Sequence, residues 1–205
     1  MSPTTVNCCY DQLTNSINIM PGFVTSAVYT DEMSDEELFA TMGVVIGHEI
    51  SHGFDFCGSQ FDGYGRGRSI FTADDADTFV KKTQRLADYY SSIQISDGVY
   101  VDGENLKVET AADLSGLQAS LACAKKIEGF DAKEYFHSFA KLWTRIFSRG
   151  STLAISFDSH PLNYLRTNVN VQMFDDMYET YGVREGDNMY LVPEERIVMW
   201  GTDAT

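Results

Sequence analysis

The chain has 205 residues, enough for one domain with a hydrophobic core, and a formal net charge of −15. This acidic excess argues against binding to nucleic acid or to anionic membranes, which attract basic surfaces. No apolar run is long enough to span a bilayer, no charged-then-apolar signal begins at Met1, and the four cysteines lack the spacing of a disulfide framework or a Cys-x-x-Cys zinc site.

The first predicted elements are a short strand over 16–20 and a helix that begins near Ser34. Ser34-Asp35-Glu36-Glu37 is a capping box, a signature of a helix N-terminus. The apolar residues that follow recur at helical spacing, and they are Leu38, Met42, Val45 and Ile46. The sequence therefore predicts a helix that continues into the segment after position 46.

Late on this helix the chain reads Gly47-His48-Glu49-Ile50-Ser51-His52. Two histidines four residues apart share one helix face and can bind a single zinc ion, and Glu49 then lies where a general base is needed. Zinc polarises a scissile carbonyl and lowers the pKa of its water, while the glutamate takes the proton. The pattern predicts a zinc-dependent peptidase; the alternative is a chance match on an unrelated helix.

The remaining elements follow in chain order. We expect a glycine-rich loop over 58–68, polar turns near 97–98 and 102–103, and a short strand over 189–192. Helices are expected over 72–92, from the segment around Glu109 to about 126, over 131–147 and over 169–180. Two apolar stripes are expected in the core, and they comprise Phe79, Leu86 and Tyr90, and Tyr135, Phe139, Leu142 and Ile146. The prediction is one mainly α-helical α+β domain that spans 1–205.

Catalytic zinc usually has three protein ligands, so one is still to be found. The class with a third histidine needs Gly at position 55 and His at 58, whereas this chain has Asp55 and Gly58, and that class is excluded. The other common solution is a glutamate on a later helix, and Glu109 offers one, with Asp113 one turn further on. Asp113 could orient a ligand histidine, and Asp55 could do the same for His52. Solvated helix charge is the alternative explanation for each carboxylate.

These residues resemble the catalytic end of the neprilysin and endothelin-converting-enzyme family of zinc endopeptidases, and most of all its bacterial members such as oligopeptidase O. The resemblance covers nearly the whole chain through separate segments in the same order, which are Val6 to Tyr10, Val45 to Asp55, Glu109 to Asp113, Phe139 to Trp143, Asp158 to Pro161 with Arg166, and Gly186 to Trp200. It implies a zincin-type, thermolysin-like catalytic lobe with a small β component. It also implies one Zn²⁺ per chain, bound by His48, His52 and Glu109, with Glu49 as the base and Asp113 supporting a ligand.

The resemblance assigns further roles. Asn7 would hydrogen-bond the substrate backbone, His160 would stabilise the tetrahedral oxyanion, and Arg166 would grip a substrate carbonyl with its planar guanidinium. The pocket for the residue after the cut would be apolar in this family. The candidates for its lining are Phe23, Val45 and Trp143, although core packing explains these residues equally well.

The chain departs from the family pattern in three ways. Thr110 stands where the family usually has Asn after the ligand glutamate, and Cys8 and Cys9 replace an Ala and an aromatic residue. The chain is also far shorter than family members, which carry a helical N-terminal lobe that faces the catalytic lobe. We therefore expect the catalytic lobe alone, with a facing lobe, a partner chain or a second copy as possible partners.

The four cysteines are most simply reduced thiols in a cytoplasm, whereas an excised lobe would allow a secreted or anchored protein. The leading functional hypothesis is an endopeptidase that acts on short peptides. The second is an interaction module that binds zinc but needs a partner polypeptide to turn over substrate. The third is a metal-free structural relic of a peptidase.

Overall fold

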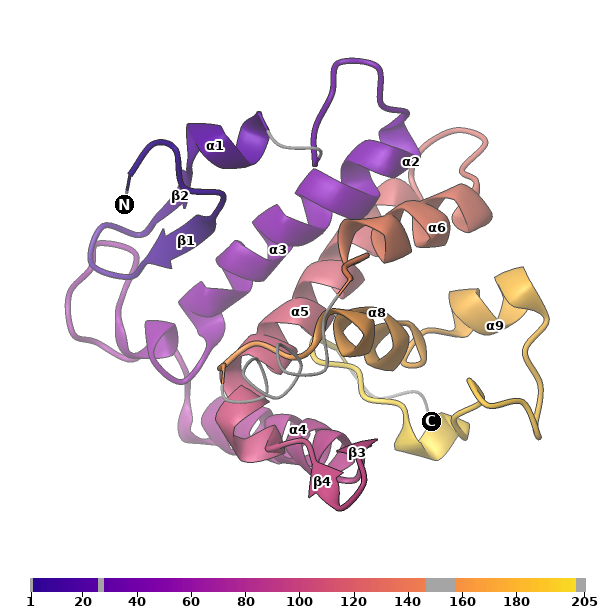
Figure 1. Ribbon diagram of the computed structural model, residues 1–205. Helices are drawn as coiled ribbons and strands as arrows, with labels where there is room; N and C mark the ends of the chain where they lie inside the picture. The colour runs from indigo at the N-terminus through magenta and orange to yellow at the C-terminus, as the bar shows by residue number, and fades with distance from the viewer. Residues whose placement is uncertain (1, 26–27, 147–157, 202–205) are drawn as a thin grey trace. The chain divides into compact units, whose positions relative to one another are not determined.

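The computed structural model describes residues 2–25, 28–146 and 158–201, and these residues are mainly helical (Figure 1). The contacts divide the chain into two compact units, Met1–Thr72 with Ala112–Leu142, and Ala73–Ala111 with Trp143–Thr205. Helix α5 (Gly103–Ala124) passes from the second unit into the first. Among the described residues, no helix combines the length and the apolar character needed to cross a bilayer.

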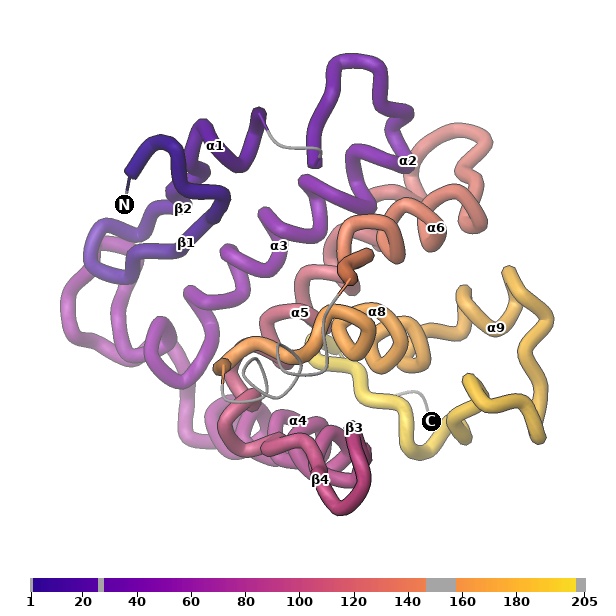
Figure 2. Tube along the Cα trace, viewed as in Figure 1, coloured from indigo at the N-terminus to yellow at the C-terminus, as the bar shows by residue number. Residues whose placement is uncertain are grey.

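The first unit begins with a hairpin. Strands β1 (Cys8–Asp11) and β2 (Ser16–Ile19) pair antiparallel, with Cys8 opposite Ile19. The turn between them places Asn15 at a φ of 48°, a left-handed conformation that asparagine tolerates better than most residues. A single turn of helix, α1 (Pro21–Val24), follows, and the hairpin lies beside α3 (Figure 2). Strand β2 confirms the strand predicted over 16–20, whereas β1 was not predicted.

The predicted motif helix is present and has three parts. It begins as α2 (Asp35–Leu38), passes through a π-helical turn (Phe39–Gly43) and continues as α3 (Val44–Ser51). The capping box is confirmed, because the Ser34 hydroxyl accepts from the Glu37 amide at 3.1 Å and the Glu37 carboxylate accepts from the Ser34 amide at 3.1 Å. A short 3₁₀ turn (His52–Phe54) ends the helix.

Two glycines allow α3 and the second half of α5 to touch along their backbones. A Cβ atom on Gly116 would lie 2.6 Å from the His48 amide nitrogen and 2.6 Å from the Val44 carbonyl oxygen. On the facing helix, a Cβ on Gly47 would lie 3.0 Å from the Gly116 carbonyl oxygen. No larger residue fits at 116 without moving a helix backbone, so this contact fixes how far α5 lies from the histidines.

Helix α6 (Ala132–Leu142) packs against α2 and the π turn. Of its predicted stripe, Tyr135 and Phe139 are buried as expected. The helix stops at Leu142, however, and Ile146 is 98% exposed, so the predicted extension to 147 is wrong for 143–146. Position 147 lies outside the described residues. Past Leu142 the chain is no longer helical and the stripe no longer faces the core.

The second unit contains α4 (Ala73–Ser91), the hairpin of β3 (Gln94–Ser96) and β4 (Val99–Tyr100), and the first turns of α5. The predicted α4 stripe is confirmed, since Phe79, Leu86 and Tyr90 are all buried. The buried ammonium of Lys82 donates to the carbonyls of Val198 at 2.7 Å and Gly201 at 2.9 Å. This side chain therefore holds the C-terminal segment on α4.

The helix predicted over 169–180 is two helices, α8 (Asn163–Val171) and α9 (Asp175–Tyr181). They are separated because Phe174 is extended, with φ −116° and ψ 127°. The predicted strand over 189–192 is absent from the described chain. Its backbone groups pair with side chains instead, since the Leu191 amide donates to the Tyr178 hydroxyl at 3.0 Å and the Met189 carbonyl accepts from the Gln172 amide group at 3.2 Å.

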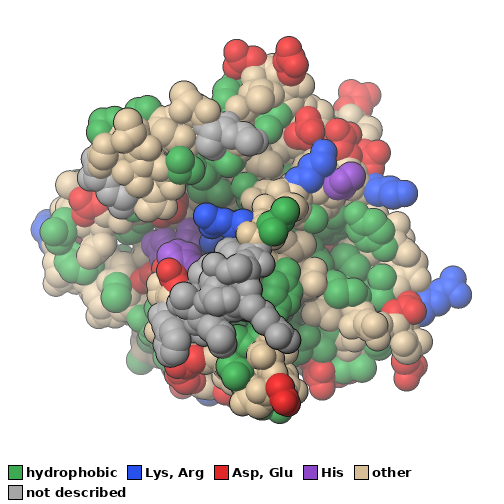
Figure 3. Space-filling model, viewed as in Figure 1, with side chains coloured by type: hydrophobic (Ala, Val, Ile, Leu, Met, Phe, Trp, Pro, Cys, Tyr) green, Lys and Arg blue, Asp and Glu red, His purple; other side chains and the backbone are tan. Residues whose placement is uncertain are grey.

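Acidic side chains occur at several separate places on the face drawn in Figure 3. Their distribution agrees with the net charge of −15 and with a chain whose acids are spread through its sequence. Charge of this kind favours solubility and repels polyanions.

Candidate metal centre

His48 and His52 come from successive turns of the motif helix and turn the same ring atom toward one another. Their Nε2 atoms are 3.1 Å apart, and their rings are nearly perpendicular at 86°. His48 is buried, and His52 is partly exposed where α3 passes into the 3₁₀ turn. The four-residue spacing read from the sequence thus produces two nitrogen donors at one point.

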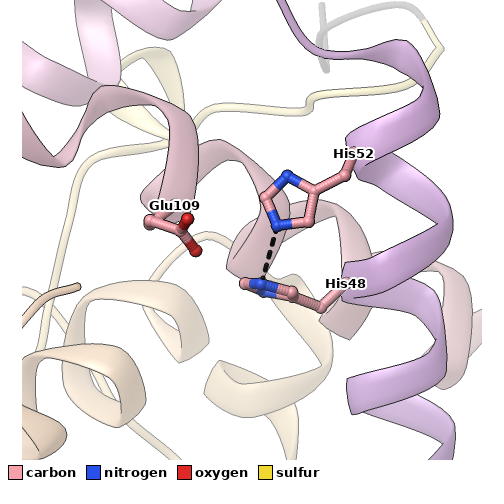
Figure 4. A group of neighbouring side chains, drawn as sticks. All are labelled: His48, His52 and Glu109. Atoms are coloured by element: carbon pink, nitrogen blue, oxygen red, sulfur yellow. Dashed lines mark hydrogen bonds between the residues drawn. The ribbon is translucent and has the colours of Figure 1, made fainter. Parts of the chain in front are cut away.

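A carboxylate holds the opposite nitrogen of each ring. The Nδ1 atom of His48 lies 2.9 Å from Asp113 Oδ1, and that of His52 lies 2.9 Å from Asp55 Oδ2. A carboxylate only accepts, so each Nδ1 carries a proton, and Nε2 is the ring atom that is left to bind a metal. The two Nε2 atoms lie within hydrogen-bond distance of each other (Figure 4), and either of them can instead bind a cation when its ring is neutral. Both supporting carboxylates were predicted from the sequence.

Asp55 is itself fixed by the backbone. Its Oδ1 atom accepts from the amides of Cys57 at 2.7 Å and Gly58 at 2.8 Å, while its other oxygen faces His52. The side chain is buried and has little freedom to turn. The orientation of the His52 ring is therefore determined by the turn that ends the helix.

Glu109 lies one turn before Asp113 on α5, and its carboxylate points toward the two imidazoles (Figure 4). One ligand atom each from His48, His52 and Glu109 lies within 4.8 Å of the others. Tetrahedral zinc with bonds of about 2.1 Å separates its ligands by about 3.4 Å, which is close to the 3.1 Å between the two Nε2 atoms. Two imidazoles and one carboxylate also form a common donor set of catalytic zinc, so the residues present fit the metal.

Glu49 points away from solvent on α3 and is 6% exposed. Cys8, at the start of β1, is also buried, and its pKa is raised to about 11 by burial and, second, by the negative charge of Glu49. The thiol that replaces the family's alanine therefore lies within electrostatic range of the predicted base. Thr110, the other replacement, is buried and donates back to the Leu106 carbonyl at 3.0 Å within its own helix.

His160 lies next to Glu109, with 3.2 Å between its Nε2 and Glu109 Oε2. Asp158 holds the other side of the ring, because its Oδ1 lies 2.8 Å from Nδ1 and accepts from the His160 amide at 2.9 Å. The hydrogen bond to Glu109 is the main reason that the pKa of His160 is raised, and the His160 amide is the main reason that the pKa of Asp158 is lowered. We did not predict a role for Asp158, although its place two residues before His160 was a usable signal.

Arg166 stacks on Trp143, with its guanidinium carbon 3.6 Å from the centre of the indole ring. Trp143 is half-buried, as are Arg166 and Val45, whereas Phe23 is buried in α1. Asn7 is exposed just before β1, and its carbonyl accepts from the Met20 amide at 3.2 Å. The predicted roles of these residues toward a substrate stay predictions.

Comparison with known proteins gives a match between residues 7–197 and the model of peptidase family M13. The chain belongs to peptidase family M13. M13 metallopeptidases are zinc enzymes, and the predicted resemblance to the neprilysin family is therefore confirmed. The chain is 31% identical to a neutral endopeptidase of Lactococcus lactis subsp. lactis over 95% of its own length and 31% of the relative's. It is 30% identical to an endothelin-converting enzyme homolog of Locusta migratoria over 70% of this chain and 21% of that one.

Solved structures give the same result for the fold of this M13 chain. PepO from Lactobacillus rhamnosis superposes with a TM-score of 0.88 at 30% identity, over 98% of this chain and 32% of that one. The zinc metalloprotease Zmp1 of Mycobacterium tuberculosis, solved with an inhibitor, superposes with a TM-score of 0.90 at 27% identity. The match covers 98% of this chain and 33% of that one. The predicted mainly helical, zincin-type lobe is confirmed. The chain spans about a third of the length of these relatives.

Proposed function

We propose that this chain is the catalytic part of a zinc metalloendopeptidase that hydrolyses peptide bonds in short peptides. The observation that carries the proposal is the convergence of His48, His52 and Glu109, whose ligand atoms lie within 4.8 Å of one another. These three residues would hold one zinc ion, and Asp113 and Asp55 would keep the histidine nitrogens turned toward it. When bound, zinc would polarise the scissile carbonyl and lower the pKa of a water molecule.

The other residues of the site would act on the proton and on the substrate. Glu49 would take a proton from the attacking water and pass it to the leaving amine. His160, held by Asp158, would donate a hydrogen bond to the oxyanion that develops on the substrate. Arg166, supported by Trp143, would bind a substrate carbonyl, and Asn7 would bind the substrate backbone. Phe23, Val45 and Trp143 are proposed to contact an apolar side chain after the cut.

Glu49→Gln tests this function, because glutamine has the shape of glutamate but accepts no proton. We expect zinc to bind with unchanged affinity and hydrolysis of a quenched fluorescent peptide to fall by about 10²- to 10⁴-fold. Glu32→Gln makes the same change at an exposed position and is expected to leave activity unchanged. Hydrolysis that survives both the Glu49 substitution and removal of zinc by a chelator would disprove the mechanism.

A second candidate is a zinc-binding lobe that cleaves peptides only with a partner polypeptide. The Lactococcus relative extends well beyond the matched part, since this chain covers 31% of it. The partner would be a facing lobe, another chain or a second copy. One zinc per chain without hydrolysis, followed by hydrolysis on addition of a second polypeptide, would support this candidate over the first.

A further inference from the structure

Three side chains project from consecutive turns of α5 on one face. Asn105, Glu109 and Asp113 are spaced by four residues, so each lies almost directly above the next. Asp113 holds the ring of His48, and Glu109 is the candidate zinc ligand. Asn105 has no part in the proposed function, although it shares this face.

The contact that Asn105 makes leads to His160. Its side-chain amide donates to the backbone carbonyl of Asp158 at 2.9 Å. The Asp158 carboxylate then binds the amide and the ring of His160, and that ring approaches Glu109 at 3.2 Å. The loop that carries His160 is thus joined to α5 at two points one helical turn apart, through Asn105 and through Glu109.

The loop has little burial of its own at this place. The side chains of Asp158 and His160 are 54% and 48% exposed, and residues 158–162 form neither helix nor strand. Pro161 and Leu162, which follow, are buried and hold the end that leads into α8. On the other side of His160, the described contact with α5 is the hydrogen bond from Asn105.

Asn105 is well placed to support this loop because its own position is fixed. Its backbone amide donates to Asp102 Oδ1 at 3.1 Å, and Asp102 thereby caps the start of α5. The side chain of Asn105 is exposed, so its removal leaves no cavity and no buried group without a partner. A substitution should therefore move the loop without unfolding the protein.

We infer that Asn105 is a positioning residue for His160: by holding the Asp158 carbonyl, it sets the distance between the His160 ring and the zinc ligand Glu109. This inference rests on the proposed function for its catalytic consequence. His160 acts on charge that develops only in the transition state, so its displacement lowers kcat and leaves KM nearly unchanged. We expect Asn105→Leu, which keeps the side-chain size and removes the donor, to lower kcat between about 3-fold and about 100-fold.

The test compares Asn105→Leu with wild type in the zinc-loaded 205-residue chain. Glu104→Gln is the control, since Glu104 is an exposed neighbour whose partners are Lys107 and Gln84 rather than the loop. A His160→Ala background gives the sharpest result, because Asn105→Leu should then have no further effect on kcat. The inference would be overturned if Asn105→Leu lowered kcat equally with and without His160, or if it changed KM alone.

A second readout does not depend on activity. The His160 amide, which donates to Asp158, should exchange with solvent at least about 3-fold faster in Asn105→Leu when measured by NMR. An unchanged exchange rate overturns the positioning role whether or not the chain cleaves peptides. Faster exchange in Asn105→Leu, together with no hydrolysis by the wild-type chain, would keep the positioning role and reject the proposed function, so the two failures are distinguishable.

Discussion

Replacing Gly116 with alanine tests whether the close contact between α3 and α5 positions the metal centre. The new Cβ would lie 2.6 Å from the His48 amide nitrogen and 3.1 Å from the His48 Cα. Carbon atoms in proteins pack at about 3.5–4.0 Å, so the two helices would have to separate by roughly 1 Å. The atoms in the way belong to the backbone of α3 and cannot rotate aside.

Two effects of this substitution oppose each other. Alanine stabilises a helix interior by about 1 kcal/mol relative to glycine, whereas overpacking a core costs about 1–3 kcal/mol and occasionally more. Because backbone meets backbone here, we expect the cost of overpacking to exceed the gain in helix propensity. The free energy of unfolding should then fall by about 1–2 kcal/mol. Separation would also stretch the 2.9 Å bond between His48 and Asp113, which should weaken zinc binding by about 10-fold.

Urea unfolding of the zinc-free protein, followed by circular dichroism, measures the first effect. Competition with a chromogenic chelator measures the zinc affinity. Gly67→Ala is the matched control, because a Cβ at Gly67 meets no atom within 4 Å and should change neither quantity substantially. A Gly116→Ala protein that is more stable than wild type and binds zinc equally well would refute the reasoning.

Three further predictions concern single side chains. Asp113→Asn keeps the shape but loses the charge beside His48, and chelator competition should show zinc affinity reduced by about 10- to 100-fold, about 1.4–2.7 kcal/mol. The pKa of about 11 leaves roughly one Cys8 thiol in a thousand ionised at pH 8. Iodoacetamide should therefore alkylate the exposed Cys57 long before Cys8, as measured by peptide mapping, and equal labelling of the two would contradict this. Lys82→Met leaves the carbonyls of the C-terminal segment without their donor and should lower the free energy of unfolding in urea by about 2 kcal/mol, whereas Lys81→Met, at an exposed position, should change it by under about 0.5 kcal/mol.

The parts of this molecule that follow from local sequence were predictable. The capping box and the helical spacing after it depend on residues within a few turns, and both are present as expected. The position of Asp113 one turn after Glu109 likewise follows from helix geometry alone. The carboxylate partners of both histidines could therefore be named before the structure was known.

Contacts between distant segments could be predicted only where the chemistry of a zinc site called for them, as for Asp113 and His48, and the others could not. Strand β1 exists because β2 pairs with it, and the contact of α3 with Gly116 depends on a residue more than sixty positions away. The break between α8 and α9 has neither proline nor glycine at 172–174, and the sequence pattern across it is compatible with one helix. Asn105 was overlooked for the same reason, since its partner is a loop carbonyl 53 positions later.

The π-helical turn at Phe39–Gly43 has a consequence for how such chains vary. Each residue of an α-helix turns by about 100°. Adding or removing one residue between the cap and the histidines would therefore normally rotate the histidines relative to the cap. A π turn accommodates one additional residue within an otherwise continuous helix. Loss of one residue from this stretch would therefore convert the π turn into α-helix, while the cap and the histidines keep their faces. The face on which His48 lies therefore does not require one exact number of residues between Ser34 and His48.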